Sequence, residues 1–299
     1  MTDAGMAIVV VNHNTREHLR RCLASLVADT PAQTVVVDTG SSDGSADLVR
    51  YEFPAVELVE TDNRGYGAGA NAGLARSRSR YTLLLNADTR PCPGAPLALA
   101  SYLDEHPRAA VAGPLIVDEH GHVEPTARKF PTPLEILLQE SGLHRILRRK
   151  VRNGAPQEVD WVLGAALALR RDALADVGGF DESYFMYNEE VDLCLRLRRA
   201  GWEVHYAPAA TVVHFGGAST SLQRAAMVQQ YVRSTAALYR RHFSRTEQAQ
   251  LKAILGAALT ARSVRERARL LITFDRARRR AVRSELEAWR SAREALRGV

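Results

Sequence analysis

Three apolar stretches and the polar residues that follow them decide the fold: MAIVVVNHN (6–14), TVVVDTGSSDG (34–44) and YTLLLNADT (81–89). Each begins as a β-branched or leucine-rich run typical of a strand that is buried on both faces. Helical patterns and one further short strand lie between them: residues 16–28, 45–51 and 69–76 for the helices, and 56–59 for the strand. This alternation predicts an α/β fold with a mostly parallel central sheet. Ligands of such sheets bind beyond the carboxyl ends of the strands.

The second half of the chain has a less regular pattern. The stretch 125–156 is rich in Pro, Arg and Leu, and we expect it to be irregular with one amphipathic helix. The remaining expected elements are a helix at 95–105, one or two strands within 109–117, strand character at 159–169, a helix at 188–200, two short strands within 203–214, and helices from 222 onward. No repeat of fixed period and no low-complexity linker is present.

Charge is distributed unevenly along the 299 residues, whose net charge is +6. Residues 240–299 hold 16 basic and 6 acidic residues, a net +10, so the preceding 239 residues carry −4. A basic helical segment of this kind is typical of a solvated helix that packs on the catalytic domain, and it also suits an anionic partner, either a membrane surface or a nucleic acid. The sequence contains no recognisable nucleic-acid module, which makes nucleic acid the less favoured partner.

Cysteine content and hydropathy indicate a compartment. The three cysteines are widely spaced and odd in number, and no zinc-type spacing occurs, so we expect neither a disulfide nor a zinc framework. No signal peptide is evident, and no apolar run approaches the ~18–20 residues that span a bilayer. We expect a cytoplasmic protein that is soluble or peripheral on the inner face of the cell membrane.

Acidic residues follow two of the predicted strands. Asp38 begins a small-residue turn and could face a base or ribose, although Asp, Ser and Gly also serve ordinary turns. Asp88, in Asn86-Ala87-Asp88, could bind a divalent cation that bridges two phosphates, or simply cap the next segment. His214, at the end of another strand, could bind metal or diphosphate, although an isolated histidine is more often structural.

Three acids crowd the start of the helix predicted at 188–200: Glu189, Glu190 and Asp192. The helix dipole favours negative charge at this position, which explains at least one of them. Neighbouring carboxylates also raise one another's pKa, so a general base is the alternative interpretation.

Eight segments occur in a characteristic order: VVNHN (10–14), the Asp38–Ser45 turn, NRGYG (63–67) with NAGL (71–74), LLLNADT (83–89), WVLGAA (161–166), GGFDE (178–182), residues 189–196, and HFGG (214–217). This set closely resembles inverting family-2 glycosyltransferases of the GT-A fold, especially the bacterial rhamnosyltransferase-like branch. The resemblance extends from Ala7 to Phe243, about four fifths of the chain. It implies a Rossmann-like GT-A catalytic domain over residues 1–243 and a basic helical extension over 244–299.

The resemblance assigns roles to individual positions. Asp38 corresponds to the aspartate that contacts the donor's base, and Asp88 to the last acid of the metal motif. Glu190 corresponds to the catalytic base, with Asp192 as second choice, and His214 joins the metal and diphosphate site. The metal would be Mg²⁺ or Mn²⁺. The other implied donor-binding residues are Asn12, Gly40, Asn63, Gly65, Asn71, Asn86 and Ala87, and the acceptor side comprises Trp161, Gly164 and Ala165.

Some positions depart from the family pattern. Thr39 stands where Asn or Asp is commoner, and the base is Glu rather than Asp. The Gln-x-x-Arg-Trp motif of processive synthases is absent, which favours addition of single sugars.

The implied donor is a dTDP- or UDP-linked sugar, with L-rhamnose from dTDP-rhamnose the leading expectation. The acceptor would be a glycan, a lipid-linked glycan of cell-wall or polysaccharide biosynthesis, or a small secondary metabolite. A sugar-phosphate nucleotidyltransferase would need a Gly-rich basic loop after the first strand, where Asn12-His13-Asn14-Thr15 stands instead. A non-catalytic nucleotide-sugar-binding protein would have lost the metal and base acids, which are present.

Overall fold

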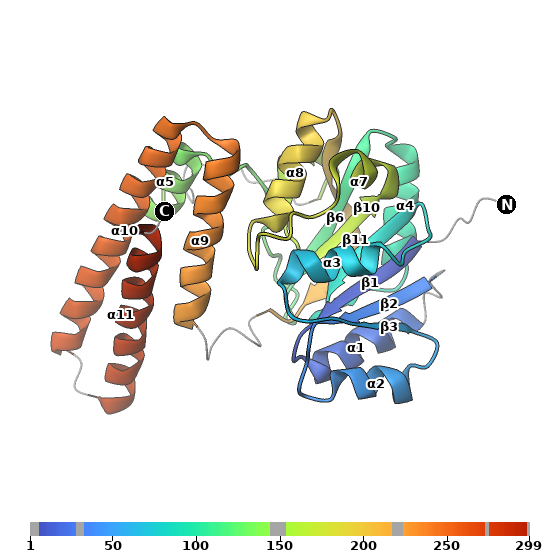
Figure 1. Cartoon of the computed structure of the whole chain (residues 1–299), viewed down its shortest axis with the longest axis horizontal. Helices are drawn as coiled ribbons and strands as arrows, with labels where there is room; N and C mark the ends of the chain where they lie inside the picture. Colours follow the sequence, from blue (N-terminus) through green and yellow to red (C-terminus); the bar gives the residue numbers. More distant parts are fainter. Residues whose placement is uncertain (1–5, 28–32, 144–153, 217–223, 273–274, 298–299) are drawn as a thin grey trace. The chain divides into compact units, whose positions relative to one another are not determined.

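A computed structural model describes residues 6–27, 33–143, 154–216, 224–272 and 275–297. The chain forms two compact units. One comprises residues 1–130, 150–185 and 189–218, and the other comprises residues 131–149, 186–188 and 219–299. The first contains the sheet and the second is helical (Figure 1). The expected boundary at residue 243 stays a prediction, although α9 (Arg224–His242) already belongs to the helical unit.

A nine-stranded sheet organises the first unit, in the order β3-β2-β1-β4-β10-β6-β11-β5 with β8 also paired to β11. Its strands are β1 (Met6–Asn12), β2 (Gln33–Asp38), β3 (Glu57–Glu60), β4 (Tyr81–Asn86), β5 (Thr89–Pro91), β6 (Ala109–Val117), β8 (Gln157–Val159), β10 (Ala166–Arg170) and β11 (Glu203–His214). The strands β1, β2, β3, β4, β6 and β11 point one way, and β5, β8 and β10 the other. A separate ribbon pairs β7 (Ala127–Arg128) with β9 (Trp161–Val162).

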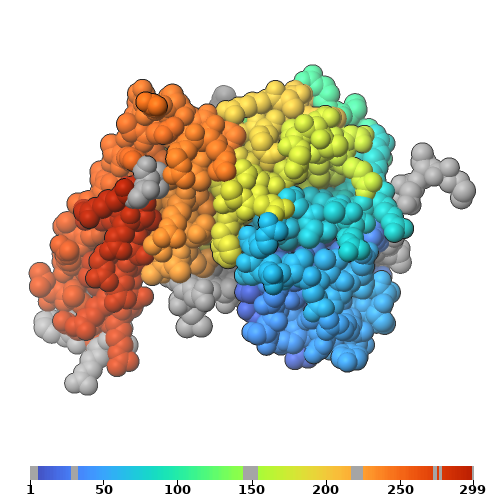
Figure 2. Space-filling model, viewed as in Figure 1, coloured from blue at the N-terminus to red at the C-terminus, as the bar shows by residue number. Residues whose placement is uncertain are grey.

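Helices cover both faces of this sheet because successive strand residues point to opposite sides. In β1, Ile8 and Val10 pack with one set of helices, whereas Val9 and Val11 pack with the other. The first set is α1 (Arg16–Leu26), α2 (Ser45–Glu52) and α4 (Ala95–Glu105), and the second is α3 (Tyr66–Leu74), α7 (Arg171–Val177) and α8 (Glu189–Arg199). In Figure 1 the second set lies in front of the strands, and in Figure 2 its atoms form the visible surface of the sheet unit on that side. The predicted α/β class and mostly parallel sheet are therefore confirmed.

Two expected boundaries need correction. The helix predicted at 69–76 is α3, which begins earlier, at Tyr66. The two short strands predicted within 203–214 form the single strand β11, which pairs with β6 over its length. The register shifts between Ala207 and Thr211, where Pro208 has no N–H to donate to the ladder. A bulge therefore replaces the expected break.

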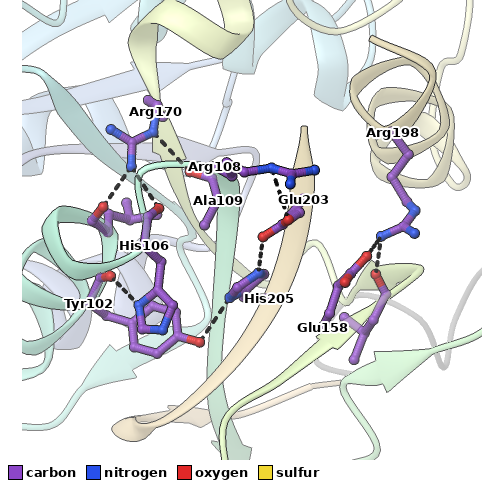
Figure 3. A network of polar contacts seen from close by, with 11 residues as sticks. Tyr102, His106, Arg108, Ala109, Glu158, Arg170, Arg198, Glu203 and His205 are labelled. Atoms are coloured by element: carbon purple, nitrogen blue, oxygen red, sulfur yellow. Dashed lines mark hydrogen bonds and ion pairs between the residues drawn. The ribbon is translucent and has the colours of Figure 1, made fainter. Parts of the chain in front are cut away.

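A polar network stabilises the sheet at the edge opposite the carboxyl ends of the parallel strands (Figure 3). The buried guanidinium of Arg170 donates to the carbonyls of Leu103 at 2.6 Å and Ala109 at 2.9 Å. His205 accepts from the Tyr102 hydroxyl at 2.9 Å and donates to Glu203 at 3.0 Å. Every described polar group of these side chains has a partner of this kind, so the network fixes the sheet rather than offering a site.

The helical unit comprises α5 (Pro133–Ser141), α9, α10 (Arg245–Ile272) and α11 (Arg276–Arg297). Its core includes Tyr239 of α9, Leu255 and Leu259 of α10, and Trp289 of α11. The Tyr239 hydroxyl donates to the carbonyl of Pro131 at 2.5 Å. None of the helices in the described part of the chain has the length and hydropathy of a membrane span.

Candidate active site

The carboxyl ends of β1, β2 and β4 meet at one edge of the sheet. Asn12 pairs in register with Asp38, and Val11 pairs with Asn86. The polar residues that follow these three strands in the sequence are therefore brought together, as the parallel arrangement predicts.

Asn12 and Asp38 form a buried pair at this edge. Nδ2 of Asn12 donates to Oδ2 of Asp38 at 2.8 Å, and the backbone N–H of Ser41 donates to Oδ1 at 2.8 Å. Oδ1 of Asn12 in turn accepts from the Thr15 hydroxyl at 2.7 Å. Each group fixes the other's rotamer, so the Asp38 turn is held rigidly against β1.

The turn residues Gly40, Asn63 and Gly65 line the same edge. Gly40 has φ +71°, and a Cβ there would lie 3.7 Å from the backbone nitrogen of Asn63. Nδ2 of Asn63 lies 3.3 Å from Nε2 of His13, whose Nδ1 donates to the carbonyl of Thr39 at 2.8 Å. Gly65 has φ +103°, and a Cβ there would collide with the backbone of Phe185. Glycine at 65 is therefore required for this close approach.

Asn71 ties α3 to the loop before α8. Its Nδ2 donates to the carbonyl of Phe180 at 2.9 Å and to Glu182 at 3.1 Å. Its Oδ1 accepts from the N–H of Phe180 at 2.9 Å. The amide is thus committed to holding this loop, and its expected contact with a donor stays a prediction.

Asp88 and His214 come together beyond β4 and β11. Nε2 of His214 lies 3.6 Å from Oδ1 of Asp88, and Nδ1 lies 3.2 Å from Oε2 of Glu124. With Nδ1–H donated to Glu124, the lone pair of Nε2 faces Asp88. The backbone N–H of Phe215 donates to the carbonyl of Asp88 at 2.9 Å, which fixes the two segments together.

The donor atoms around Asp88 fit a hard divalent cation. Oδ1 of Asn86 is buried and has no hydrogen-bond partner among the described residues. In the part of the chain that the structure describes, no three His, Cys, Asp or Glu side chains are grouped to enclose an ion. Mg²⁺ is commonly bound through one or two carboxylates with phosphate oxygens as further ligands. The set of Asp88, His214 and Asn86 suits that arrangement.

Glu190 is the second residue of α8 and packs against Gly164, where a Cβ would lie 3.5 Å from the Glu190 Cδ. Its Oε2 is buried without a hydrogen-bond partner among the described residues. Burial raises the pKa of Glu190, although the N–H of Gly164 and the charge of Arg128 partly oppose this. A carboxylate with a raised pKa and a free oxygen is suited to accept a proton.

Two neighbours share this environment. Burial and the charge of Glu190 raise the pKa of Glu189 well above its usual value. The Tyr66 hydroxyl donates to the carbonyl of Gly164 at 3.3 Å. Burial, followed by the charges of Glu189 and Glu190, raises the pKa of Tyr66 as well, so its phenol stays protonated at neutral pH.

Asp192, the alternative base, has a different environment. Its carboxylate is buried and accepts from Nε of Arg196 at 2.7 Å. The Arg196 guanidinium also donates to the carbonyls of Val177 and Gly179, both at 2.7 Å. Asp192 therefore neutralises a cation that anchors the loop before α8.

The expected acceptor-side residues lie beside these groups. The carbonyl of Ala165 accepts from the N–H of Asn86 at 3.0 Å, which joins this segment to the end of β4. Trp161 donates from Nε1 to the carbonyl of Lys129 at 2.7 Å, and Arg128 lies over its ring at 5.4 Å from the centroid. The structure thus places Gly164 and Ala165 between Glu190 and the end of β4.

Residues 7–178 match the sequence profile of "Glycosyl transferase family 2". The N-acetylglucosaminyl-diphospho-decaprenol L-rhamnosyltransferase of Mycobacterium tuberculosis is 34% identical over 79% of this chain and 83% of its own length. This chain is a family-2 glycosyltransferase. The rhamnosyltransferase WbbL of Escherichia coli K12 is 26% identical over 70% of this chain and 82% of its own. The mannosyltransferase PcManGT of Pyrobaculum calidifontis, solved with GDP-Man and Mn²⁺, shares the GT-A fold at TM-score 0.58 and 15% identity, covering 98% of this chain and 86% of that one.

Membership of the family establishes the class of reaction. The glycosyltransferase is a hexosyltransferase of the inverting type, and it belongs to a rhamnosyltransferase-like branch. The predicted family, fold and enzyme class are confirmed.

Three residues of the candidate site were not among the predicted site residues. Glu124 lies between the strand predicted at 109–117 and the irregular stretch 125–156, and it contacts His214 from 90 positions away. Tyr66 precedes the predicted start of α3. Glu189 was predicted only as one of three acids at the start of a helix, with no specific role in the site. The Tyr66-Gly67 pair within NRGYG was the available signal for Tyr66, whereas no local pattern marks Glu124.

Proposed function

We propose that this glycosyltransferase transfers L-rhamnose from dTDP-rhamnose to a hydroxyl of a lipid-diphosphate-linked N-acetylglucosamine. Two relatives named as rhamnosyltransferases support the sugar, and the printed name of the Mycobacterium tuberculosis relative supports the acceptor. The product would serve cell-envelope glycan or polysaccharide assembly.

The donor would bind along the edge formed by β1, β2 and β4. Asp38, held by Asn12, would receive the base and ribose beside Gly40 and Asn63. The rigidity of this pair supports the assignment, since a fixed carboxylate binds a ligand without first losing rotamer freedom. Asn86 and Ala87 would lie next to the sugar diphosphate.

Asp88 and His214 would hold Mg²⁺ or Mn²⁺ together with the diphosphate, and Oδ1 of Asn86 is available to the same ion. The cation would neutralise negative charge on the leaving diphosphate. Glu124 would keep Nε2 of His214 directed at this site through the Nδ1–H bond.

Glu190 would act as the general base from the face of the sugar opposite the diphosphate. As the acceptor oxygen bonds to the anomeric carbon, the bond from that carbon to the diphosphate oxygen breaks. The hydroxyl proton passes to Glu190, and the nucleoside diphosphate leaves. The observation that carries this role is the buried carboxyl oxygen of Glu190 beside Gly164, which has no hydrogen-bond partner among the described residues, in contrast to the ion-paired Asp192.

The proposal is tested by mixing dTDP-rhamnose, Mn²⁺ and polyprenyl-diphospho-N-acetylglucosamine with the purified protein and detecting the lipid product by mass spectrometry. We expect transfer by the native protein and by Glu105→Gln, an exposed control at the end of α4. Glu190→Gln should retain donor binding and lose transfer. Transfer only from a UDP-hexose would contradict the sugar assignment, and transfer only to small alcohols would contradict the acceptor.

A further inference from the structure

One face of α10 is apolar and exposed along most of the helix. Residues three, four and seven apart share a helical face. Six residues at such spacings are exposed: Ala253, Ala257, Ala261, Val264, Ala268 and Leu271. Val264 is 59% exposed and Leu271 81% exposed. This apolar stripe is about 27 Å long at ~1.5 Å per residue, whereas α10 packs its opposite face on α5, α9 and α11 (Figure 1).

Within α10, the exposed charged residues around the apolar stripe are basic. Between residues 248 and 272 the sequence has one acid, Glu266, and its carboxylate is buried on the opposite face where it binds Arg265 and Arg269. The exposed basic residues of the same stretch include Lys252 and Arg267, and Arg267 lies three residues after Val264.

A basic cavity adjoins the stripe at Arg267. The cavity has a volume of about 430 Å³ and lies between α10 and α11. Its lining contains four arginines, which are Arg267, Arg290, Arg293 and Arg297, together with Glu287 and Glu294. The planar guanidinium of an arginine can donate two parallel hydrogen bonds to the oxygens of one phosphate, so the cavity suits a phosphate headgroup.

We propose that the helical unit docks on an anionic bilayer through the α10 stripe, with the arginine cavity receiving lipid phosphate. An apolar stripe between basic residues is the composition of a helix that lies in the membrane interface. A second copy of this chain fits less well, because two such faces would bring positive flanks together. Nucleic acid would leave the apolar stripe without a partner. The surface would present the enzyme to the lipid-linked acceptor, and to that extent the inference rests on the proposed function.

The test is flotation of the full chain with vesicles of phosphatidylcholine alone or with phosphatidylglycerol added. We expect binding to the anionic vesicles that weakens as salt rises. Val264→Glu with Leu271→Glu should reduce binding at least about tenfold, since both apolar contacts are lost and two negative charges are added. The matched control is Tyr51→Glu with Leu97→Glu, two residues of the sheet unit that are 82% and 68% exposed. This control should bind anionic vesicles better than the stripe variant.

A second variant tests the cavity. Arg290→Gln with Arg293→Gln should weaken partitioning about fivefold per arginine (~1 kcal/mol each), and only for anionic vesicles. Equal binding of the native chain to both vesicles, or of the stripe variant and its control, would overturn the proposal. The proposal would also be overturned if the stripe variant still bound vesicles but no longer self-associated in sedimentation, because the stripe would then be an interface between two copies of the chain. The vesicles contain no acceptor, and donor binding is measured separately by thermal shift with dTDP, so failure of docking and failure of the proposed transferase activity are distinguishable.

Discussion

Replacing Asp192 by Asn should destabilise the sheet unit, whereas replacing Glu190 by Gln should not. The Asp192 side chain is 1% exposed and that of Arg196 is 23% exposed. Nε of Arg196 donates to the Asp192 carboxylate at 2.7 Å, and the same guanidinium holds the loop before α8. Removing one partner of a buried ion pair costs about 3–5 kcal/mol, and the partial exposure of Arg196 places this pair near about 3 kcal/mol. At about 2–4 °C per kcal/mol, the melting temperature should fall by about 6–12 °C.

Glu190 differs because burial disfavours its charged form. A group whose pKa is raised in the folded state loses stabilisation as pH rises through that pKa. Glu190→Gln removes this cost, so its melting temperature at pH 7 should equal or exceed that of the native protein. Thermal unfolding and transfer assays on both variants give the comparison. An unchanged melting temperature for Asp192→Asn, combined with lost transfer and active Glu190→Gln, would refute the reasoning and make Asp192 the base.

Three further changes have defined outcomes. The transfer rate should fall as pH drops through the raised pKa of Glu190, and a pH–rate profile flat down to about pH 4.5 would contradict the base assignment. Glu124→Gln should weaken Mn²⁺ binding, measured by calorimetry with dTDP present, by about 10–100-fold because it loosens His214; unchanged affinity would remove Glu124 from the site. Gly65→Ala should destabilise the protein by about 1–3 kcal/mol or more, because φ is +103° and the methyl meets Phe185; a normal melting temperature would show that the loop relaxes.

The sequence was sufficient to predict the fold because its strands are strongly marked. The apolar runs that end at Val11 and Leu85 became β1 and β4, which pair in parallel. Parallel pairing was predictable because helices alternate with the strands along this part of the chain. The same logic placed Asn12, Asp38 and Asn86 at one edge. Strand β11 was predicted as two short strands, whereas its pairing with β6 continues through a register shift between Ala207 and Thr211.

The site could be predicted only where its residues follow strands. Glu124 lies in an irregular stretch, and only the tertiary fold brings it to His214. Glu190 and Asp192 look alike as acids at a helix start, because the dipole favours both. Their difference arises from partners: Arg196 stands four residues after Asp192, a spacing that forms ion pairs on a helix, whereas Glu190 faces Gly164. That spacing was the one local signal that could have separated them.

The most direct test of the donor site is the thermal shift produced by dTDP with and without Mn²⁺, compared between the native protein and Asp88→Asn. A ligand at about 100 times its Kd adds about 2.7 kcal/mol to the free energy of unfolding. We expect a shift in the native protein that requires Mn²⁺, the same shift in the exposed control Asp104→Asn, and its loss in Asp88→Asn. Equal Mn²⁺-dependent shifts in the native protein and Asp88→Asn would contradict the assignment of this edge as a metal-assisted donor site.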